Sequence, residues 1–402
     1  GQHPGGIVVI PGYMDVFDFT PFQFPADDNT SAWRTTHFDY HAIDQDVLKL
    51  DILGHDDPTI LRMLQDLSSI DVTTLPLNDE KVLSLPTSPK ALGVTSEQIR
   101  CETGTLGLPE MGTNFVINML VKAKPKTFGD LVKISGLSHG TDVWNGNAES
   151  LIDNKICEFS EVIGCRDDIM VYLSNHGLKA KDAFKIMEFV RKGKAKKDPA
   201  GWQVWKAKMQ EAGIVDWYIN SCEKIQYMFP KAHACAYVMS AIRIAWFKVY
   251  QPLNYYATYF SIRTFDFDID AMVKGYDAIY KRLVDLENKG FEASNKESNI
   301  IETLKIALEA SARGVKFGQI SLDKSDSKKF IIEGDTLIPP FRALDGLGDT
   351  VASAIIEERS KRYFLSIEDL QKRAKVSQTL IDKMRDMHIF DDLPESSQLS
   401  LF

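Results

Sequence analysis

The chain has 402 residues, of which 44% are hydrophobic and 26% are charged, and its formal net charge is −9. This composition is ordinary for two or three globular domains and excludes a disordered chain and a uniformly basic surface. Lys, Arg or Pro interrupts every apolar run well before the ~18 residues that a membrane-spanning helix needs, and no secretory signal opens the sequence. We therefore expect a cytoplasmic protein without a membrane partner.

Two further observations bound the kind of chain. Its five cysteines form neither a Cys-x-x-Cys pair nor a cluster with histidine, so we expect buried thiols and no zinc site. Because Gly1 stands in the middle of an apparent strand and turn, we expect a fragment of a longer protein.

Residues 1–65 predict strands at 6–10 and 47–54. In the second strand, alternation places Asp51 on one face and Leu48, Leu50 and Ile52 on the other. A carboxylate on a rigid strand suits a hard cation such as Mg²⁺. A solvated aspartate at a strand end is the alternative, because one carboxylate does not make a metal site.

Residues 75–112 are rich in Pro, Gly and Thr and predict a linker into a helical region. Within that region the loop 135–147 combines several glycines with His139 and Trp144. Its amides, His and Trp could contact a nucleic-acid backbone and stack on a base. A plain surface loop with a packed Trp144 accounts for the same residues.

A strongly basic stretch precedes the segment around which the rest of the chain is organised. Residues 179–208 contain ten Lys or Arg against three acids, a local excess of +7. Immediately downstream, apolar residues at spacings of three and four over 234–249 predict one face of a buried helix.

The start of that helix is unusual. Phe229-Pro230 sets its beginning, and Lys231 and His233 place cations where the helix dipole favours anions. We expect the missing negative charge to arrive as a ligand, with phosphate the natural candidate. The alternative is that both side chains are solvated or cap neighbouring carbonyls.

Residues 341–362 carry the most specific local motif. A short helix, the turn Gly346-Leu347-Gly348 and a second helix form the helix-hairpin-helix pattern, upstream of a degenerate second hairpin. Amides at the N-terminus of the second helix can bind a phosphate oxygen without reading base sequence, and the basic pair Lys361-Arg362 favours duplex DNA. A bare αα-hairpin is the alternative.

The chain ends in an apolar pentapeptide. After a polar stretch its last residues are Gln398, Leu399, Ser400, Leu401 and Phe402. Such an end predicts a short motif that enters a partner's hydrophobic pocket, and docking on the chain itself is the alternative.

Taken together, these stretches resemble one family over essentially the whole chain. The resemblance rests on GQHPGGIVVIP, LKLDILGHDDPT, SGLSHGTDVWNGNA, VIGCRDDIMVYL, VRKGK, YMFPKAHACAYV, the helix-hairpin-helix and the QLSLF ending. The family is the PolC branch of the bacterial C-family replicative DNA polymerases.

The resemblance implies an α+β fold that is mostly α. It places the end of a nucleotidyltransferase-like mixed-sheet palm at 1–65, helical fingers at 66–262, a duplex-binding domain at 263–392 with tandem helix-hairpin-helix motifs at 341–392, and a clamp-binding tail at 393–402. It implies template-directed addition of dNMP to a primer 3′-hydroxyl by two-metal chemistry, in which this fragment alone is inactive.

The resemblance also implies site residues and partners. Asp51 would be one ligand of Mg²⁺, with its partner aspartates outside this chain. Primer-template DNA, dNTP, the sliding clamp and other replisome subunits would be partners. The triphosphate of the dNTP would contact Arg166, Arg191, Lys192, Lys194 and Lys231, and its base and sugar would contact Tyr227 and His233. Phosphates of the DNA would contact Gly346 and Gly348. The clamp would contact residues 398–402.

Two other function classes stay open from the residues alone. One is a non-catalytic module that binds DNA and tethers it to a clamp. The other is a phosphate-binding metabolic enzyme with a small-molecule pocket and no duplex affinity.

Overall fold

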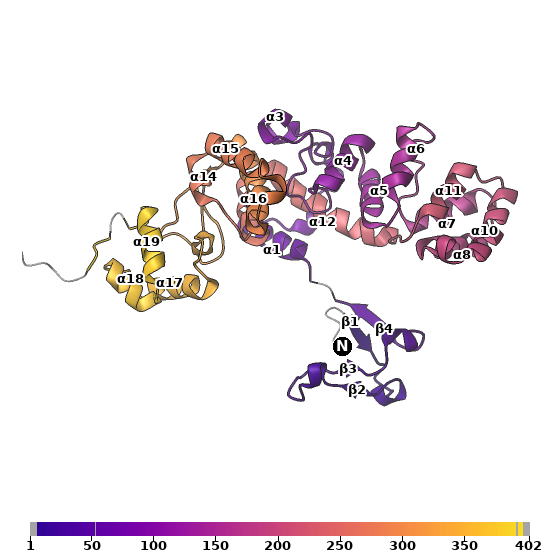
Figure 1. Cartoon of the computed structure of the whole chain (residues 1–402), viewed down its shortest axis with the longest axis horizontal. Coiled ribbons are helices and arrows are strands. Elements are labelled where there is room, and N and C mark those ends of the chain that lie inside the picture. The colour runs from indigo at the N-terminus through magenta and orange to yellow at the C-terminus, as the bar shows by residue number, and fades with distance from the viewer. Residues whose placement is uncertain (1–5, 53, 391–392, 397–402) are drawn as a thin grey trace, which may run out of the picture. The chain divides into compact units, whose positions relative to one another are not determined.

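The computed structural model of the chain describes residues 6–52, 54–390 and 393–396. The chain divides into two compact units, Gly1–Asp56 and Asp57–Phe402 (Figure 1). The first contains short strands and single-turn helices, and the second is built mainly of α-helices, so the predicted α+β, mostly α class is confirmed.

The first unit holds two small antiparallel sheets. Strand β1 (Gly6–Val9) pairs with β4 (Leu48–Asp51), and β2 (Phe22–Gln23) pairs with β3 (Thr35–Thr36). In the first sheet Gly6 lies opposite Asp51, so Asp51 stands at the end of its strand. Both strands predicted for this region are confirmed.

One face of the β1–β4 sheet is apolar and exposed. The register sets Ile7 opposite Leu50 and Val9 opposite Leu48, so all four side chains share a face. The alternation expected around Asp51 is therefore present, but no described residue of the unit buries the aliphatic side. Its members are Ile7 (41% exposed), Val9 (37%), Leu48 (62%), Leu50 (45%) and Ile52 (57%).

The second unit is a helical body with a small sheet. Its longer helices are α1 (Asp56–Ser68), α4 (Asn114–Ala123), α5 (Phe128–His139), α7 (Arg166–Asn175), α8 (Ala180–Arg191), α10 (Pro199–Glu211), α11 (Asp216–Lys224), α12 (Lys231–Tyr250), α13 (Pro252–Ile262), α15 (Tyr276–Glu287), α16 (Asn295–Ala312), α17 (Asp349–Lys361), α18 (Ile367–Ala374) and α19 (Gln378–Asp386). Shorter helices are α2 (Glu80–Ser84), α3 (Ser96–Ile99), α6 (Glu149–Asp153), α9 (Lys194–Lys197) and α14 (Ile269–Lys274).

Helix α12 passes through the main core of this unit. Val238, Ala241, Ile242 and Ala245 are each at most 1% exposed, which confirms the buried face predicted from their spacing. Pro230 is the N-cap, with extended backbone at ψ 150°, so the helix begins at Lys231. The proline at this boundary sets the start of the helix, as expected.

A second, smaller core holds the hairpin region together. Ala352 and Ile355 of α17 pack with Leu370 of α18 and Met384 of α19. Ser366 and Ser377 cap α18 and α19. Before this core, β6 (Ile331–Glu333) and β7 (Thr336–Ile338) form a hairpin with its turn at Gly334-Asp335, and β5 (Lys316–Phe317) adds in parallel to β7.

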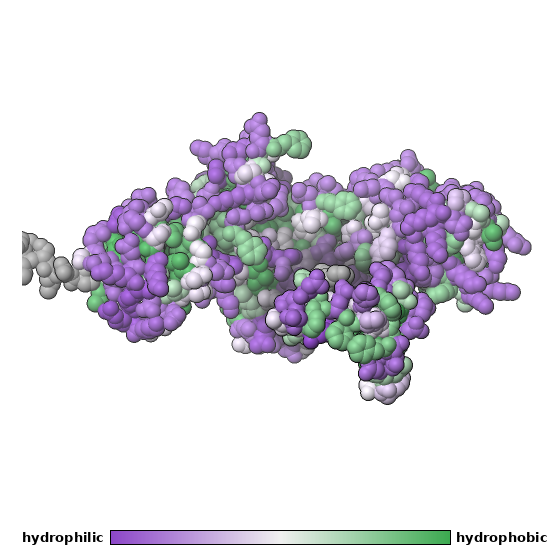
Figure 2. All heavy atoms as spheres, turned by 60° about the horizontal axis from the view of Figure 1, so that its bottom comes forward, coloured by the Kyte–Doolittle hydropathy of each residue, from purple (hydrophilic) through white to green (hydrophobic). Residues whose placement is uncertain are grey.

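The face shown in Figure 2 is largely hydrophilic, with scattered apolar patches. Among the described residues, no helix has the length and apolar character needed to cross a membrane. Cys157, Cys165 and Cys222 are buried free thiols, as predicted, whereas Cys101 and Cys235 are partly exposed free thiols.

Candidate nucleotide and DNA sites

The segment 226–231, which leads into α12, is the common neighbour of the predicted triphosphate residues. The amide of Met228 donates to the carbonyl of Arg191 at 3.3 Å, and the amide of Arg166 donates to the carbonyl of Phe229 at 3.3 Å. Arg166 begins α7 and Arg191 ends α8, and the two helices lie side by side (Figure 1). Residues far apart in sequence therefore meet along one short segment.

Gly193 lets the basic loop after α8 lie against this segment. Its φ is +63°, a conformation that L side chains rarely adopt. A Cβ at this position would lie 2.5 Å from the carbonyl oxygen of Gln226. The glycine thus brings Lys192 and Lys194 next to segment 226–231, and both side chains are exposed.

Glu188 gathers three of the predicted cations. Its carboxylate accepts from Arg191 Nε at 2.5 Å and from Arg191 Nη2 at 2.9 Å. Lys192 Nζ lies 3.2 Å and Arg166 Nη1 3.9 Å from the same carboxylate. The hydrogen bond from Arg191 is the main cause that lowers the pKa of Glu188 below its ordinary value.

Two aspartates of α7 compensate the basic first turn of α12. The amide of Lys231 donates to Asp167 Oδ2 at 2.6 Å, and Lys231 Nζ lies 3.4 Å from Asp168 Oδ1. Asp168 raises the pKa of Lys231. Helix α7 therefore supplies negative charge to this helix start, and an anionic ligand at the same place stays a prediction.

Five aromatic rings surround the start of α12. His233 stacks on Phe229 with centroids 4.9 Å apart and contacts Tyr237 at 4.6 Å. Tyr227 meets Phe229 edge-on at 5.0 Å. His139, from the end of α5, lies 6.0 Å from His233 and 5.7 Å from Phe229. Tyr227 and His233, predicted to pack on base and sugar, thus belong to one cluster.

The loop predicted to touch nucleic acid is divided between two environments. Thr141 pairs with Tyr227 as an isolated bridge, so the loop runs beside the segment before α12. Trp144 is only 4% exposed, which favours the packed-tryptophan alternative over stacking on a base. His139 faces the aromatic cluster, not Trp144.

Asp51 belongs to the first unit. Its carboxylate is 60% exposed and pairs with Lys49 Nζ at 3.0 Å. Among the residues that the structure describes, no group of three or more His, Cys, Asp or Glu side chains could hold a metal ion. The described residues therefore do not form a complete Mg²⁺ site, and Asp51 stays a prediction.

The first hairpin turn has the geometry that the motif predicts. Gly346 has φ +89°, and Gly348 is the N-cap of α17, which has no side-chain cap. Lys383 Nζ donates to the carbonyl of Asp345 at 3.0 Å, so a cation lies at this turn. Lys361 pairs with Glu358 at 2.7 Å and Arg362 with Asp369 at 3.1 Å, so both predicted cations have acidic partners.

The predicted clamp-binding residues 398–402 lie outside the described residues. Residues 393–396 are described and are tied to α18. The amide of Ile367 donates to the carbonyl of Pro394 at 2.9 Å, and the amide of Glu368 donates to the carbonyl of Glu395 at 3.1 Å.

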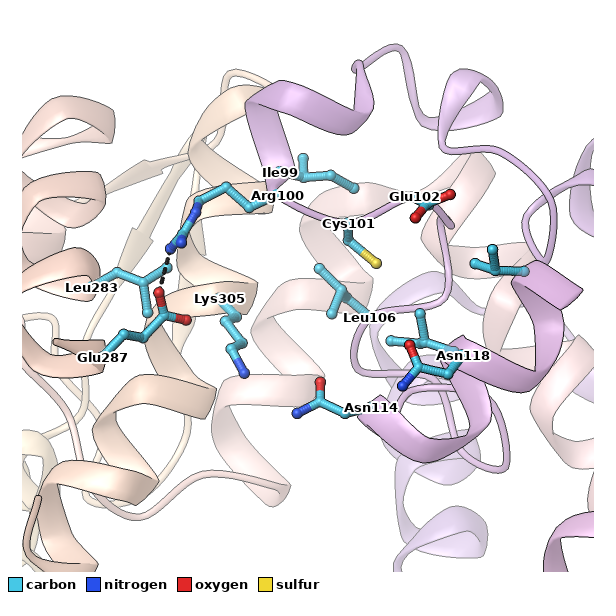
Figure 3. Close-up of a pocket in the computed structure, with 12 residues that line it drawn as sticks. Ile99, Arg100, Cys101, Glu102, Leu106, Asn114, Asn118, Leu283, Glu287 and Lys305 are labelled. Atoms are coloured by element: carbon cyan, nitrogen blue, oxygen red, sulfur yellow. Dashed lines mark hydrogen bonds and ion pairs between the residues drawn. The ribbon is translucent and has the colours of Figure 1, made fainter. Parts of the chain in front are cut away.

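A cavity of about 440 Å³ lies elsewhere in the second unit (Figure 3). Asn114 and Asn118 from α4 and Lys305 from α16 line it, beside an ion pair between Arg100 and Glu287 at 2.6 Å. Among the predicted site residues that the structure describes, none lines this cavity.

Sequence reasoning did not assign several residues to the cluster: Asp167, Asp168, Glu188, Phe229 and Tyr237. The spacing of Glu188 to Arg191 and Lys192, at i+3 and i+4 on a helix, was the available signal for the first contact. Asp167 and Asp168 contact Lys231 from a different helix, and the spacing of residues along the sequence does not reveal such a contact.

Three family models match the chain. Residues 1–54 match the bacterial DNA polymerase III alpha NTPase domain, residues 57–213 match the bacterial DNA polymerase III alpha subunit finger domain, and residues 314–399 match a helix-hairpin-helix motif. The candidate cations Arg166, Arg191, Lys192 and Lys194 all lie inside the finger match.

Curated relatives align with the whole chain. It is 56% identical to DNA polymerase III PolC-type of Bacillus subtilis, 57% to that of Listeria innocua and 55% to that of Staphylococcus epidermidis. In each case 100% of this chain aligns with 28% of the relative. The chain therefore spans a little over a quarter of the length of these relatives.

Proposed function

Because this chain belongs to the PolC-type family of bacterial DNA polymerase III alpha subunits, we propose that it serves template-directed DNA synthesis. It is the part of a replicative polymerase that grips the incoming dNTP and the primer-template, and chemistry requires further residues from the intact protein. The chain acts in the cytoplasm, with the sliding clamp and other replisome subunits as partners.

The observation that carries this proposal is the convergence of cations on segment 226–231. Arg166 and Arg191 adjoin it through backbone hydrogen bonds, and Lys231 is its last residue. A triphosphate needs several positive groups to hold and neutralise its oxygens, and arginine offers the bidentate geometry that suits them. Lys192 and Lys194 add exposed charge at the edge of the same group.

The aromatic cluster suits the rest of the nucleotide. Tyr227 is 43% exposed, so part of its side chain is available to a base or sugar. His233 follows Lys231 by two residues, so both stand in the first turn of α12. His139 supports this cluster from α5.

The first unit is proposed to be the end of the palm. Its exposed aliphatic face, formed by Ile7, Val9, Leu48, Leu50 and Ile52, would pack on the remainder of that domain in the intact protein. Asp51 would supply one carboxylate to Mg²⁺, whose bound form neutralises the transferring phosphates. The other ligands would come from outside this chain.

The helix-hairpin-helix is proposed to hold duplex DNA through its backbone. The amides that follow Gly348 at the start of α17 lack a side-chain cap, which leaves them suited to a phosphate oxygen. Lys361 and Arg362 contribute less, because each already has an acidic partner. Duplex affinity should therefore vary little with base sequence.

Kinetics of the intact polymerase test the triphosphate assignment. Arg191→Gln should raise the KM for dNTP roughly 10- to 100-fold, because it removes a charged hydrogen-bonding group from the phosphates. Lys208→Gln is the matched control, since Lys208 belongs to the same basic stretch but pairs with Asp182 at 3.0 Å. Equal KM values for wild type and Arg191→Gln would show that Arg191 does not bind the dNTP and would contradict the assignment of this cation cluster to the triphosphate.

Gel shifts of the intact protein on a primed template separate the other function classes. A polymerase should bind more tightly when the complementary dNTP is added to a primer that lacks its 3′-hydroxyl. A DNA-binding module would bind equally with and without dNTP, and a metabolic enzyme would not bind the duplex.

A further inference from the structure

Glu188 stands at the centre of the cation cluster, although no part of the proposed reaction calls for an anion there. Its carboxylate contacts Arg191, Lys192 and Arg166 at the distances given above. Its side chain is 25% exposed and that of Arg191 is 22% exposed, so the pair is only partly screened by water. One carboxylate thus contacts three of the five cations assigned to the triphosphate.

A purely structural role explains this arrangement poorly. The backbone near Arg191 is already fixed by the hydrogen bond from Met228 and by the close approach of Gly193 to Gln226. An ordinary ion pair on one helix surface would join Glu188 to a single cation at i+3. Here Arg166, from a different helix, also contacts Glu188. The contacts instead resemble those that a phosphate would make, with charge-assisted hydrogen bonds to a bidentate arginine.

We propose that Glu188 is a positioning residue that acts as an internal counter-anion, holding Arg191 and Lys192 in place without nucleotide and releasing them to the triphosphate of an incoming dNTP. The inference rests on the proposed function, because it requires that these cations bind the triphosphate. The guanidinium of Arg191 presents one Nε and Nη2 edge to Glu188, so that edge cannot bind a phosphate at the same time.

The consequence is a regulated affinity. Binding of dNTP must displace or crowd an ionised carboxylate, which lowers ground-state affinity and keeps smaller anions from occupying the cluster firmly. The pKa of Glu188 lies below its ordinary value, so the carboxylate stays charged near neutral pH and protonation does not relieve the competition. Asp168 makes a comparable contact with Lys231.

Nucleotide binding by the intact polymerase tests this role. The probe is the complementary dNTP, bound to a complex with primer-template whose primer lacks the 3′-hydroxyl, at several salt concentrations. Glu188→Gln should lower the Kd roughly three- to tenfold, because a charge that competes with the phosphates is removed. The affinity should also fall more steeply with salt, since the cluster gains net positive charge.

Two variants serve as comparisons. Glu188→Asp keeps the charge and should stay within about twofold of wild type. Asp182→Asn removes a carboxylate from the same helix, where it pairs with Lys208 outside the cluster, and should leave the Kd unchanged. The melting temperature of each variant identifies any loss of folding. If the glutamine variant does not fold, Glu188→Ala, which also removes the charge, carries the same expected decrease in Kd.

The outcomes separate the inference from the function on which it rests. If Glu188→Gln binds dNTP as well as or more weakly than wild type while Arg191→Gln raises KM, Glu188 is a structural tie and the inference is overturned. If Arg191→Gln also leaves KM unchanged, the triphosphate assignment itself fails.

Discussion

Lys248 is fully buried near the end of α12, and oxygens surround its ammonium group. Nζ lies 2.9 Å from the carbonyl of Gly104, 2.5 Å from that of Leu106 and 2.8 Å from Glu309 Oε1. Tyr256 donates to the same glutamate at 2.7 Å. Burial lowers the pKa of Lys248, while Glu309 acts against that shift. The pair joins α12, α13, α16 and the loop before α4.

Breaking this pair should destabilise the protein strongly. Glu309→Gln should lower the free energy of unfolding by about 3–5 kcal/mol, because it leaves a buried ammonium without a counter-charge. Urea unfolding followed by circular dichroism measures the change. Glu333→Gln is the control, since its pair with Lys324 is about half exposed, and it should cost less than ~1 kcal/mol.

The double variant Lys248→Met with Glu309→Leu provides the decisive comparison. It removes both charges and should be more stable than Lys248→Met alone, because neither charge remains buried without its partner. Additive losses would show that the two side chains act independently.

At the scale of single residues, the sequence predicted which side chains are buried better than it predicted which side chains contact one another. The repeat over 234–249 identified the buried face of α12, since periodicity depends only on neighbouring residues. It gave no indication that Lys248 is buried, because its partner Glu309 lies 61 residues away. The same limit explains Asp167, whose carboxylate meets Lys231 across 64 residues.

At the scale of elements, one glycine controls how the basic loop meets the segment before α12. Gly193→Ala should lower the free energy of unfolding by roughly 2–4 kcal/mol, through its positive φ and the contact of the new Cβ with Gln226. It should also raise the KM for dNTP, because Lys192 and Lys194 move with the loop. Thermal unfolding and steady-state kinetics measure the two effects.

Gly213→Ala separates these causes. Gly213 has φ +75° but open space where a Cβ would lie, so alanine there should cost only the backbone term of about 1–2 kcal/mol and leave KM unchanged. Equal losses at both positions would show that the contact with Gln226 contributes nothing.

Elements with local signals were predictable from the sequence, and those made by distant pairing were not. The serine caps of α18 and α19, the Gly-x-Gly turn and the β6–β7 hairpin all follow from residues within a few positions. The parallel pairing of β5 with β7 and the capping of α12 by Asp167 join separate segments, so no local pattern encodes them.

At the scale of the whole molecule, the first unit shows what a single chain segment leaves undetermined. Its alternating pattern correctly predicted an apolar face on β4, but burial of that face depends on what packs against it. Asp51 presents the same problem, since a metal site needs ligands that the pattern of one strand cannot supply. The family resemblance, which rests on many separate motifs, therefore carried the functional assignment further than either strand.

The last prediction concerns the proposed attachment of the intact protein to a sliding clamp. Deleting residues 398–402 from the intact protein should abolish clamp binding and processive synthesis, because Leu399, Leu401 and Phe402 are the apolar side chains that a hydrophobic cleft would bury. Single-nucleotide incorporation should be unchanged. The hairpins should also stay folded, since Pro394 and Glu395 hold the preceding backbone on α18.

Ser400→Ala is the matched control within the motif and should retain most of the affinity for the clamp, whereas Leu401→Ala with Phe402→Ala should behave like the deletion. Surface plasmon resonance against the clamp and primer extension with and without it measure both properties, and equal clamp affinity with and without these five residues would assign the contact to another part of the protein.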